Sequence, residues 1–253
     1  MKVQRATNSH RMVRRSFLQA AAASAAAILL GNLPFAALAQ SGGSAKMKIG
    51  TIGSGRVGSA IGKAWVKAGH EVMFSSLDLE ADRKLAESLG GGARAGTPRE
   101  AAAFGTVLLV SVPYKALPGV GRDLADLIKG KIIIDTSNPI VARDGDMAVA
   151  AREKGAGSAS MEFLPGARIV RAFNAIGAAR MGDASGKSER VGMPIAGDDP
   201  EAISVASALI RDVGYEPVLV GTLAAMGKYL IPGAPLAGER SPDEIRKVAA
   251  TLK

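Results

Sequence analysis

The chain of 253 residues contains no cysteine, only two histidines (His10 and His70), and few aromatic residues, which make up 4% of it. The lack of cysteine excludes disulfide bonds, thiol nucleophiles and cysteine-ligated metal sites. Because no run of His, Asp and Glu has metal-ligand spacing, we do not expect a metalloenzyme. Apolar residues still make up 47% of the chain, which is enough for a packed core. This length predicts one large domain or two small ones.

Acidic residues are missing from the first 39 positions, and this absence explains much of the net charge of +9. That stretch holds five basic residues, whereas the rest of the chain carries 27 basic and 23 acidic residues. No basic stripe with interleaved aromatic residues is present in the sequence. We therefore expect no nucleic-acid partner.

Residues 1–39 have the three-part layout of a targeting segment, with an N-terminal amphipathic helix as the alternative. A basic region ends in Arg14-Arg15, an alanine-rich apolar run follows, and residues 37–39 offer a cleavage site after Ala39. The run is too short and too interrupted to span a bilayer as a mature helix. The arginine pair resembles a twin-arginine signal. We expect an exported, periplasmic protein that meets the twin-arginine export machinery, has no stable membrane anchor, and carries a linker over 40–46.

Residues 48–58 predict a strand, a glycine-rich turn and a helix. Gly53, Gly55 and Gly58 have the spacing Gly-x-Gly-x-x-Gly between an apolar strand and an amphipathic segment. The first glycine allows a tight turn, the second lets backbone N–H groups approach a pyrophosphate, and the third lets the helix pack close to the strand. The positive end of the helix dipole would face the phosphates. The pattern predicts a dinucleotide site, with a purely structural turn as the alternative.

Predicted strands and helices alternate along the rest of the chain. We expect strands over residues 48–52, 71–75, 106–112, 131–135, 169–173, 193–196 and 216–220. We expect helices over residues 56–68, 79–89, 116–128, 200–213 and 242–252, and a further helix that starts at Pro98. Two of these helices begin with capping boxes, at Thr97 and Ser241. This alternation predicts the α/β class, with a Rossmann-like, doubly wound, mainly parallel sheet. We place a Rossmann NAD(P)-binding domain at 47–180 and a small C-terminal α/β extension at 181–253.

The end of the second predicted strand carries Ser75 and Ser76 and no acid. An acid there would bind the ribose of NAD, whereas small polar and basic residues would admit the 2′-phosphate of NADP. Arg83 and Lys84 follow on the next helix, and this favours NADP, although NAD stays open. A solvated helix face is the alternative for Arg83 and Lys84.

Two further strands end in residues that suit the ligand edge of such a sheet. Ser111, Val112 and Pro113 follow one strand, and Asn138 and Pro139 follow another. Asn138 could bond a cofactor or cap a turn, and taken alone the turn is favoured.

Several blocks together resemble the deazaflavin-dependent NADP oxidoreductases (coenzyme F-420:NADP reductase-like proteins). The blocks are residues 48–58, Asp-Thr-Ser-Asn-Pro at 135–139, Arg-Ala-Phe-Asn-Ala-Ile-Gly at 171–177, 196–202 and 210–215. The resemblance implies direct hydride transfer between NADP and a deazaflavin or flavin ring, so no side chain need act as acid or base. This sequence differs from the family pattern at Leu77, where the family commonly has an arginine that holds the 2′-phosphate.

The resemblance also implies which residues form the site. Thr51, Ser54, Arg56, Val57 and Ser76 would meet the NADP. Ser111, Val112, Pro113, Asn138 and Pro139 would line the nicotinamide side. Asn174, Ile176 and Gly177 would lie near the second ring, in a pocket that the C-terminal extension completes.

Two other functions stay open. An exported, non-catalytic NAD(P)-binding sensor or carrier fits the lack of catalytic-looking clusters. A reductase of a small carbonyl or imine substrate would need a proton donor, for which Lys115 and Lys187 are the candidates. A homodimer also stays open.

Overall fold

The computed structural model describes residues 45–181 and 190–252. The predicted signal peptide, its cleavage after Ala39 and most of the predicted linker lie outside these residues. Gly43–Lys253 form one compact unit, and the predicted boundary at residue 180 stays a prediction. No helix in the described part of the chain is both long and apolar enough to cross a membrane.

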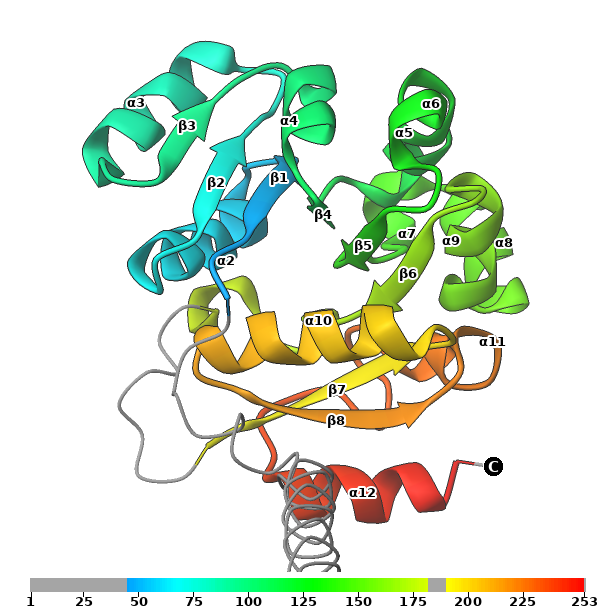
Figure 1. Ribbon diagram of the computed structural model, residues 1–253. Helices are drawn as coiled ribbons and strands as arrows, with labels where there is room; N and C mark the ends of the chain where they lie inside the picture. Colours follow the sequence, from blue (N-terminus) through cyan, green and yellow to red (C-terminus); the bar gives the residue numbers. More distant parts are fainter. Residues whose placement is uncertain (1–44, 182–189, 253) are drawn as a thin grey trace, which may run out of the picture. The chain divides into compact units, whose positions relative to one another are not determined.

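An eight-stranded sheet in the order β3-β2-β1-β4-β5-β6-β7-β8 organises the fold (Figure 1). The strands are β1 (Lys48–Ile52), β2 (Glu71–Phe74), β3 (Ala93–Ala95), β4 (Val107–Val110), β5 (Ile132–Asp135), β6 (Arg168–Arg171), β7 (Gly192–Gly197) and β8 (Glu216–Gly221). Neighbouring strands run parallel except β6 and β7. Because β1 lies between β2 and β4, the strand order reverses beside it, at the point where such sheets bind ligands. The predicted Rossmann-like, mainly parallel α/β fold is confirmed.

Helices cover both faces of this sheet. They are α2 (Arg56–Lys67), α3 (Leu79–Leu89), α4 (Pro98–Phe104), η2 (Tyr114–Ala116), α5 (Leu117–Asp123), α6 (Ala125–Ile128), α7 (Val141–Asp144), α8 (Asp146–Lys154), α9 (Ala156–Phe163), η3 (Ala178–Arg180), α10 (Pro200–Asp212), α11 (Leu223–Met226), η4 (Gly227–Tyr229) and α12 (Pro242–Ala250). One apolar cluster joins Trp65 of α2 to Leu209 of α10, and a second joins Leu117 of α5 to Ile245 of α12. Figure 1 shows α10 and α12 on opposite sides of β7 and β8.

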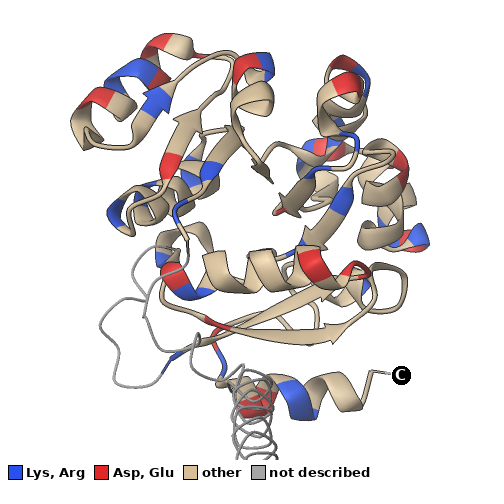
Figure 2. Cartoon of the chain, in the orientation of Figure 1, with Lys and Arg blue, Asp and Glu red and all other residues tan. Residues whose placement is uncertain are grey.

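Both predicted capping boxes are confirmed. The Thr97 hydroxyl accepts the N–H of Glu100 and the Glu100 carboxylate accepts the N–H of Thr97, and Ser241 and Glu244 repeat the arrangement. Basic and acidic residues are interspersed over the described helices (Figure 2). Many of these form exposed ion pairs, for example Arg99 with Asp126.

The single helix predicted over residues 116–128 is wrong. The chain instead forms α5 and α6 after the 3-10 turn η2, and Leu124 separates α5 from α6 with φ −117° and ψ 14°. Within α5, a Cβ on Gly121 would lie 1.7 Å from the carbonyl oxygen of Phe163. The glycine is therefore needed for close packing on α9, and packing rather than helix propensity decides this segment.

Other elements were missed or trimmed. The short helices α7, α8 and α9 and the three-residue edge strand β3 were not predicted. The strand predicted to Phe173 ends at Arg171, because Phe173 has φ 64°, which is a left-handed conformation. The strands predicted over 71–75 and 106–112 are likewise shorter in the structure.

Candidate functional site

The glycine turn joins β1 to α2 in the predicted geometry. Gly53 has φ +97°, and a Cβ there would lie 2.3 Å from the carbonyl oxygen of Ser111. A Cβ on Gly58 would lie 2.0 Å from the carbonyl oxygen of Gly53. Both glycines are therefore required by backbone packing, and they bring the start of α2 against the carboxyl ends of β1 and β4.

Gly55 differs from these two glycines, because a Cβ there would meet no heavy atom within 4 Å. Gly55 is exposed and is the N-cap of α2, which has no side-chain cap and no acid in its first turn among the described residues. Arg56 is exposed at the first helical position, and Val57 is half-buried. An open cradle over uncapped backbone N–H groups, beside a cation, fits a pyrophosphate.

Thr51 and Ser75 support the turn from below. Both are fully buried. The Ser75 hydroxyl donates to the carbonyl of Thr51, and the carbonyl of Ser75 accepts the N–H groups of Gly53 and Ser54, each at 2.9 Å. Thr51 and Ser75, both predicted to contact the cofactor, thus have no exposed surface. Their hydrogen bonds instead hold the glycine turn against the end of β2.

Ser54 and Ser76 are brought together by a residue that the sequence did not reveal. The carboxylate of Asp82, in the first turn of α3, accepts hydrogen bonds from the Ser54 and Ser76 hydroxyls, the second at 2.8 Å. Arg83, the predicted phosphate ligand, is exposed and pairs with Glu80 on its own helix. Leu77 is fully exposed. The acid at this corner was missed because it lies on the following helix and not at the end of the strand.

The edge of β4 continues the site toward the middle of the sheet. The N–H of Ser111 donates to the carbonyl of Ile52 at 2.8 Å, so the ends of β1 and β4 lie side by side. Ser111 and Val112 are partly exposed and Pro113 is exposed. These predicted residues are therefore next to Gly53 and Gly58.

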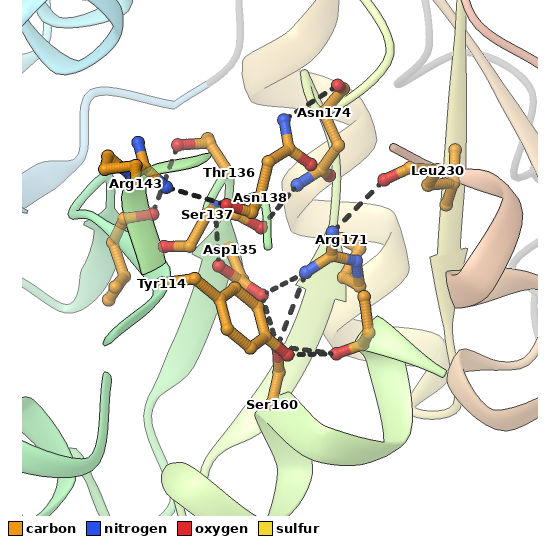
Figure 3. Close-up of polar contacts among 12 residues, drawn as sticks. Tyr114, Asp135, Thr136, Ser137, Asn138, Arg143, Ser160, Arg171, Asn174 and Leu230 are labelled. Carbon is orange, nitrogen blue, oxygen red and sulfur yellow. Dashed lines mark hydrogen bonds and ion pairs between the residues drawn. The ribbon is translucent and has the colours of Figure 1, made fainter. Parts of the chain in front are cut away.

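The ends of β5 and β6 are cross-linked by two asparagines (Figure 3). Asn138 Nδ2 donates to the carbonyl of Asn174 at 3.0 Å, and Asn174 Nδ2 donates to the carbonyl of Ser137 at 3.3 Å. The side-chain oxygens of Asn138, Asn174 and Ser137 are buried and have no partner among the described residues. Unsatisfied buried polar atoms are costly, and this group marks the ends of β5 and β6 as a candidate ligand edge. Pro139 is buried beside it.

The other two predicted second-ring residues follow Asn174. Ile176 is buried and belongs to the apolar cluster of α2 and α10, so its side chain faces the core. Gly177 is exposed, and a Cβ there would meet nothing within 4 Å. The C-terminal extension reaches this loop, because the N–H of Gly238 donates to the carbonyl of Ala175 at 2.9 Å.

A buried ion pair lies directly beneath the two asparagines. Arg171 Nη1 is 2.6 Å from Asp135 Oδ2, and both side chains are fully buried. Arg171 also donates to the carbonyl of Leu230 at 3.1 Å, which ties β6 to the C-terminal extension (Figure 3). The sequence analysis overlooked this pair. The sequence did contain a sign of it. Asp135 and Arg171 carry opposite charges at the ends of two strands whose inner residues are apolar, and they lie opposite each other when β5 and β6 pair.

Tyr114 closes this polar cluster. Its hydroxyl donates to the carbonyl of Ala156 at 2.7 Å and lies 3.3 Å from Ser160 Oγ, which in turn donates to Asp135 Oδ2 at 2.8 Å. Burial raises the pKa of Tyr114 to about 12. The phenol therefore stays neutral in the folded protein at a pH where it ionises in the unfolded chain.

We expect stability to fall between pH 10 and pH 12 for this reason. The contribution of Tyr114 is complete below pH 10, the ordinary pKa of tyrosine, and is lost as the pH rises through about 12. At about 1.4 kcal/mol per pKa unit, the loss reaches at most about 3 kcal/mol. Urea denaturation at a series of pH values measures it. Tyr114→Phe should flatten this part of the curve, and an equally steep fall in the variant would contradict the assignment.

Candidate acid–base groups are sparse at this edge. Lys115 is exposed, and its backbone N–H lies 3.5 Å from Asp144 Oδ1. Lys187, the other proton-donor candidate, lies outside the described residues. In the described part of the chain, no three His, Asp or Glu side chains group where they could hold a metal ion.

Comparisons with known proteins agree with this arrangement. Residues 48–139 match the family described as NADP oxidoreductase coenzyme F420-dependent. The chain is 32% identical to the F420-dependent NADP reductase of Methanothermobacter marburgensis, over 66% of this chain and 80% of the relative. The enzyme of the same name from Methanothermobacter thermautotrophicus is 30% identical, over 66% of this chain and 77% of the relative.

A solved structure shares the fold. A hypothetical protein from Sinorhizobium meliloti superimposes with a TM-score of 0.67 at 24% identity, covering 77% of this chain and 95% of the other. The identity to two curated relatives indicates this family, and the glycine turn and the strand order agree with it. The chain therefore belongs to the family of coenzyme F420-dependent NADP oxidoreductases.

Proposed function

We propose that this protein transfers a hydride between NADP(H) and a deazaflavin or flavin-like acceptor. The observation that carries the proposal is the open cradle at Gly55, over the uncapped start of α2. It supports a bound pyrophosphate, with the adenosine end toward Ser54 and Ser76 and the nicotinamide end toward Ser111 and Asn138. The relatives named as F420-dependent NADP reductases support the same pair of substrates.

The residues of the site have a binding and orienting task in this proposal. When bound, the two rings supply the chemistry themselves, because a hydride passes directly between them. The side-chain oxygens of Asn138 and Asn174 have almost no exposed surface, so the two asparagines would act by holding the ends of β5 and β6 in place beneath the ring. The hydrogen bonds between the two asparagine loops keep these ends together.

A groove of about 720 Å3 gives room for an acceptor. It begins at Arg56 and runs between α2, η3 and the end of α10. It reaches Ala178, which follows the predicted second-ring residue Gly177. Lys63 and Lys67 also line it. Three basic side chains line the groove against one acid, Asp212, which pairs with His70, and this excess favours an acidic acceptor over a neutral one.

The test mixes the purified full-length protein with NADPH and, in separate reactions, a deazaflavin, FMN or FAD. We expect the nicotinamide absorbance to fall with at least one acceptor, and most rapidly with the deazaflavin. Tight NADPH binding without turnover on any acceptor would instead favour a non-catalytic carrier or sensor. Turnover of a small imine or carbonyl compound alone would favour the third function.

Leu77→Arg tests where the 2′-phosphate lies. Because Leu77 is fully exposed next to Ser76, an arginine there can reach a phosphate without disturbing the core. We expect NADPH to bind about tenfold more tightly, equivalent to about 1.4 kcal/mol, with NADH unchanged. Titration calorimetry with both nucleotides measures this, and Leu77→Gln is the uncharged control. An equal gain for NADPH and NADH would place the phosphate elsewhere.

A further inference from the structure

Asp82 stands at the corner of the site where the phosphate-binding donors are expected. Its two carboxylate oxygens accept the hydroxyls of Ser54, in the glycine turn, and Ser76, after β2. The side chain is 2% exposed. No lysine or arginine in the described part of the chain pairs with it. The two serine hydroxyls and the partial positive charge at the first turn of α3 stabilise this carboxylate.

This arrangement uses up the donors that a 2′-phosphate needs. Each serine hydroxyl has one proton to donate. Ser54 donates to Asp82, and the Ser76 hydroxyl lies 2.8 Å from Asp82 Oδ2 and 3.2 Å from the carbonyl oxygen of Asp78, so Asp82 is its nearer acceptor. A phosphate at the same corner would compete for them and would face a negative charge close by. A ribose hydroxyl has the opposite requirement, since it can donate to a carboxylate.

We propose that Asp82 is a specificity-determining residue that lowers the preference of this site for NADPH over NADH. The inference rests on the proposed function, because it needs the adenosine end of a dinucleotide at Ser54 and Ser76. Asp82 acts by charge repulsion and by holding the two hydroxyls, and the neighbouring Leu77 supplies no compensating cation. Wild-type protein therefore accepts both nucleotides, with a ratio of dissociation constants, NADH over NADPH, below about tenfold.

The test is Asp82→Asn, which removes the charge and keeps the size of the side chain. Dissociation constants for NADPH and NADH are measured by calorimetry on the full chain. We expect the ratio of NADH to NADPH dissociation constants to rise at least fivefold, mainly through tighter NADPH binding. A purely structural role would weaken both nucleotides alike and leave the ratio where it was, and a rise below fivefold overturns the proposal.

Glu80→Gln is the matched control, because it removes one negative charge from the same helical turn without touching either serine. Glu80 is exposed and pairs with Arg83. The ratio of NADH to NADPH dissociation constants in Glu80→Gln should therefore stay at the wild-type value. A ratio that rises as much as in Asp82→Asn overturns the specific role of Asp82. If circular dichroism shows that Asp82→Asn does not fold, the ratio of NADH to NADPH dissociation constants of the wild-type protein becomes the test. A ratio below tenfold supports the proposal, and a larger ratio overturns it.

Failure of the proposed function is distinguishable in the same titrations. If the wild-type protein binds neither nucleotide, the dinucleotide site itself is refuted and the role of Asp82 falls with it. If both nucleotides bind and the ratio does not move in Asp82→Asn, only the role of Asp82 is refuted. Binding alone gives this readout, so the identity of the hydride acceptor does not enter.

Discussion

Gly55→Val is expected to abolish dinucleotide binding while leaving the protein folded. The Cβ position of Gly55 is free of other atoms, and its φ of −64° suits an ordinary residue, so the Cβ of a valine meets no clash in the protein itself. The added methyl groups fill the space in which the pyrophosphate approaches the start of α2. We expect at least a hundredfold loss of NADPH affinity, or about 2.7 kcal/mol or more, by calorimetry. As valine is a poor N-cap, stability should fall by no more than about 1 kcal/mol.

Two comparisons make this result specific. Gly119→Val adds the same group to a glycine of α5 whose Cβ position is nearly free, and it should leave binding unchanged. Gly58→Ala should instead destabilise the fold, because its Cβ would lie 2.0 Å from the carbonyl oxygen of Gly53. Unchanged NADPH affinity in a folded Gly55→Val protein would remove the dinucleotide from this turn.

The glycine turn could be predicted from sequence because its determinants are local. Gly53 and Gly58 are needed by atoms within the turn and by the neighbouring strand β4, and their spacing alone indicates this. Capping boxes are local in the same way, as Thr97 and Glu100 bond each other across one turn. The mainly parallel character of the sheet also follows from the alternation of elements, since parallel neighbours need crossover helices.

The features that could not be predicted from the sequence depend on contacts between residues far apart in the chain. Arg83 was predicted to face the phosphate because it is basic, but α3 is oriented so that Asp82 faces Ser54, 28 positions away. The helix expected over 116–128 is interrupted at Leu124, and α5 before it packs through Gly121 on the backbone of Phe163. Neither outcome can be derived from periodicity, because each depends on how one element is rotated against another.

The pairing of Asp135 and Arg171 is the clearest long-range case, and it carries the largest expected effect on stability. Each residue taken alone is a charge in an apolar strand, which is unfavourable. Parallel pairing of β5 and β6 sets them at the same register, 2.6 Å apart and fully buried. Their position beneath Asn138 and Asn174 means that the pair also supports the loops of the site (Figure 3).

Arg171→Met should therefore destabilise the protein by about 3–5 kcal/mol, because it leaves the Asp135 carboxylate buried without its cation. Urea denaturation measures the loss. Adding Asp135→Asn to this variant should recover part of it, since the amide carries no charge and its oxygen can still accept the N–H of Ser137. Arg99→Met, at the exposed pair with Asp126, is the matched control and should change the midpoint little. If Arg171→Met is as mild as the control, the buried pair does not stabilise the fold.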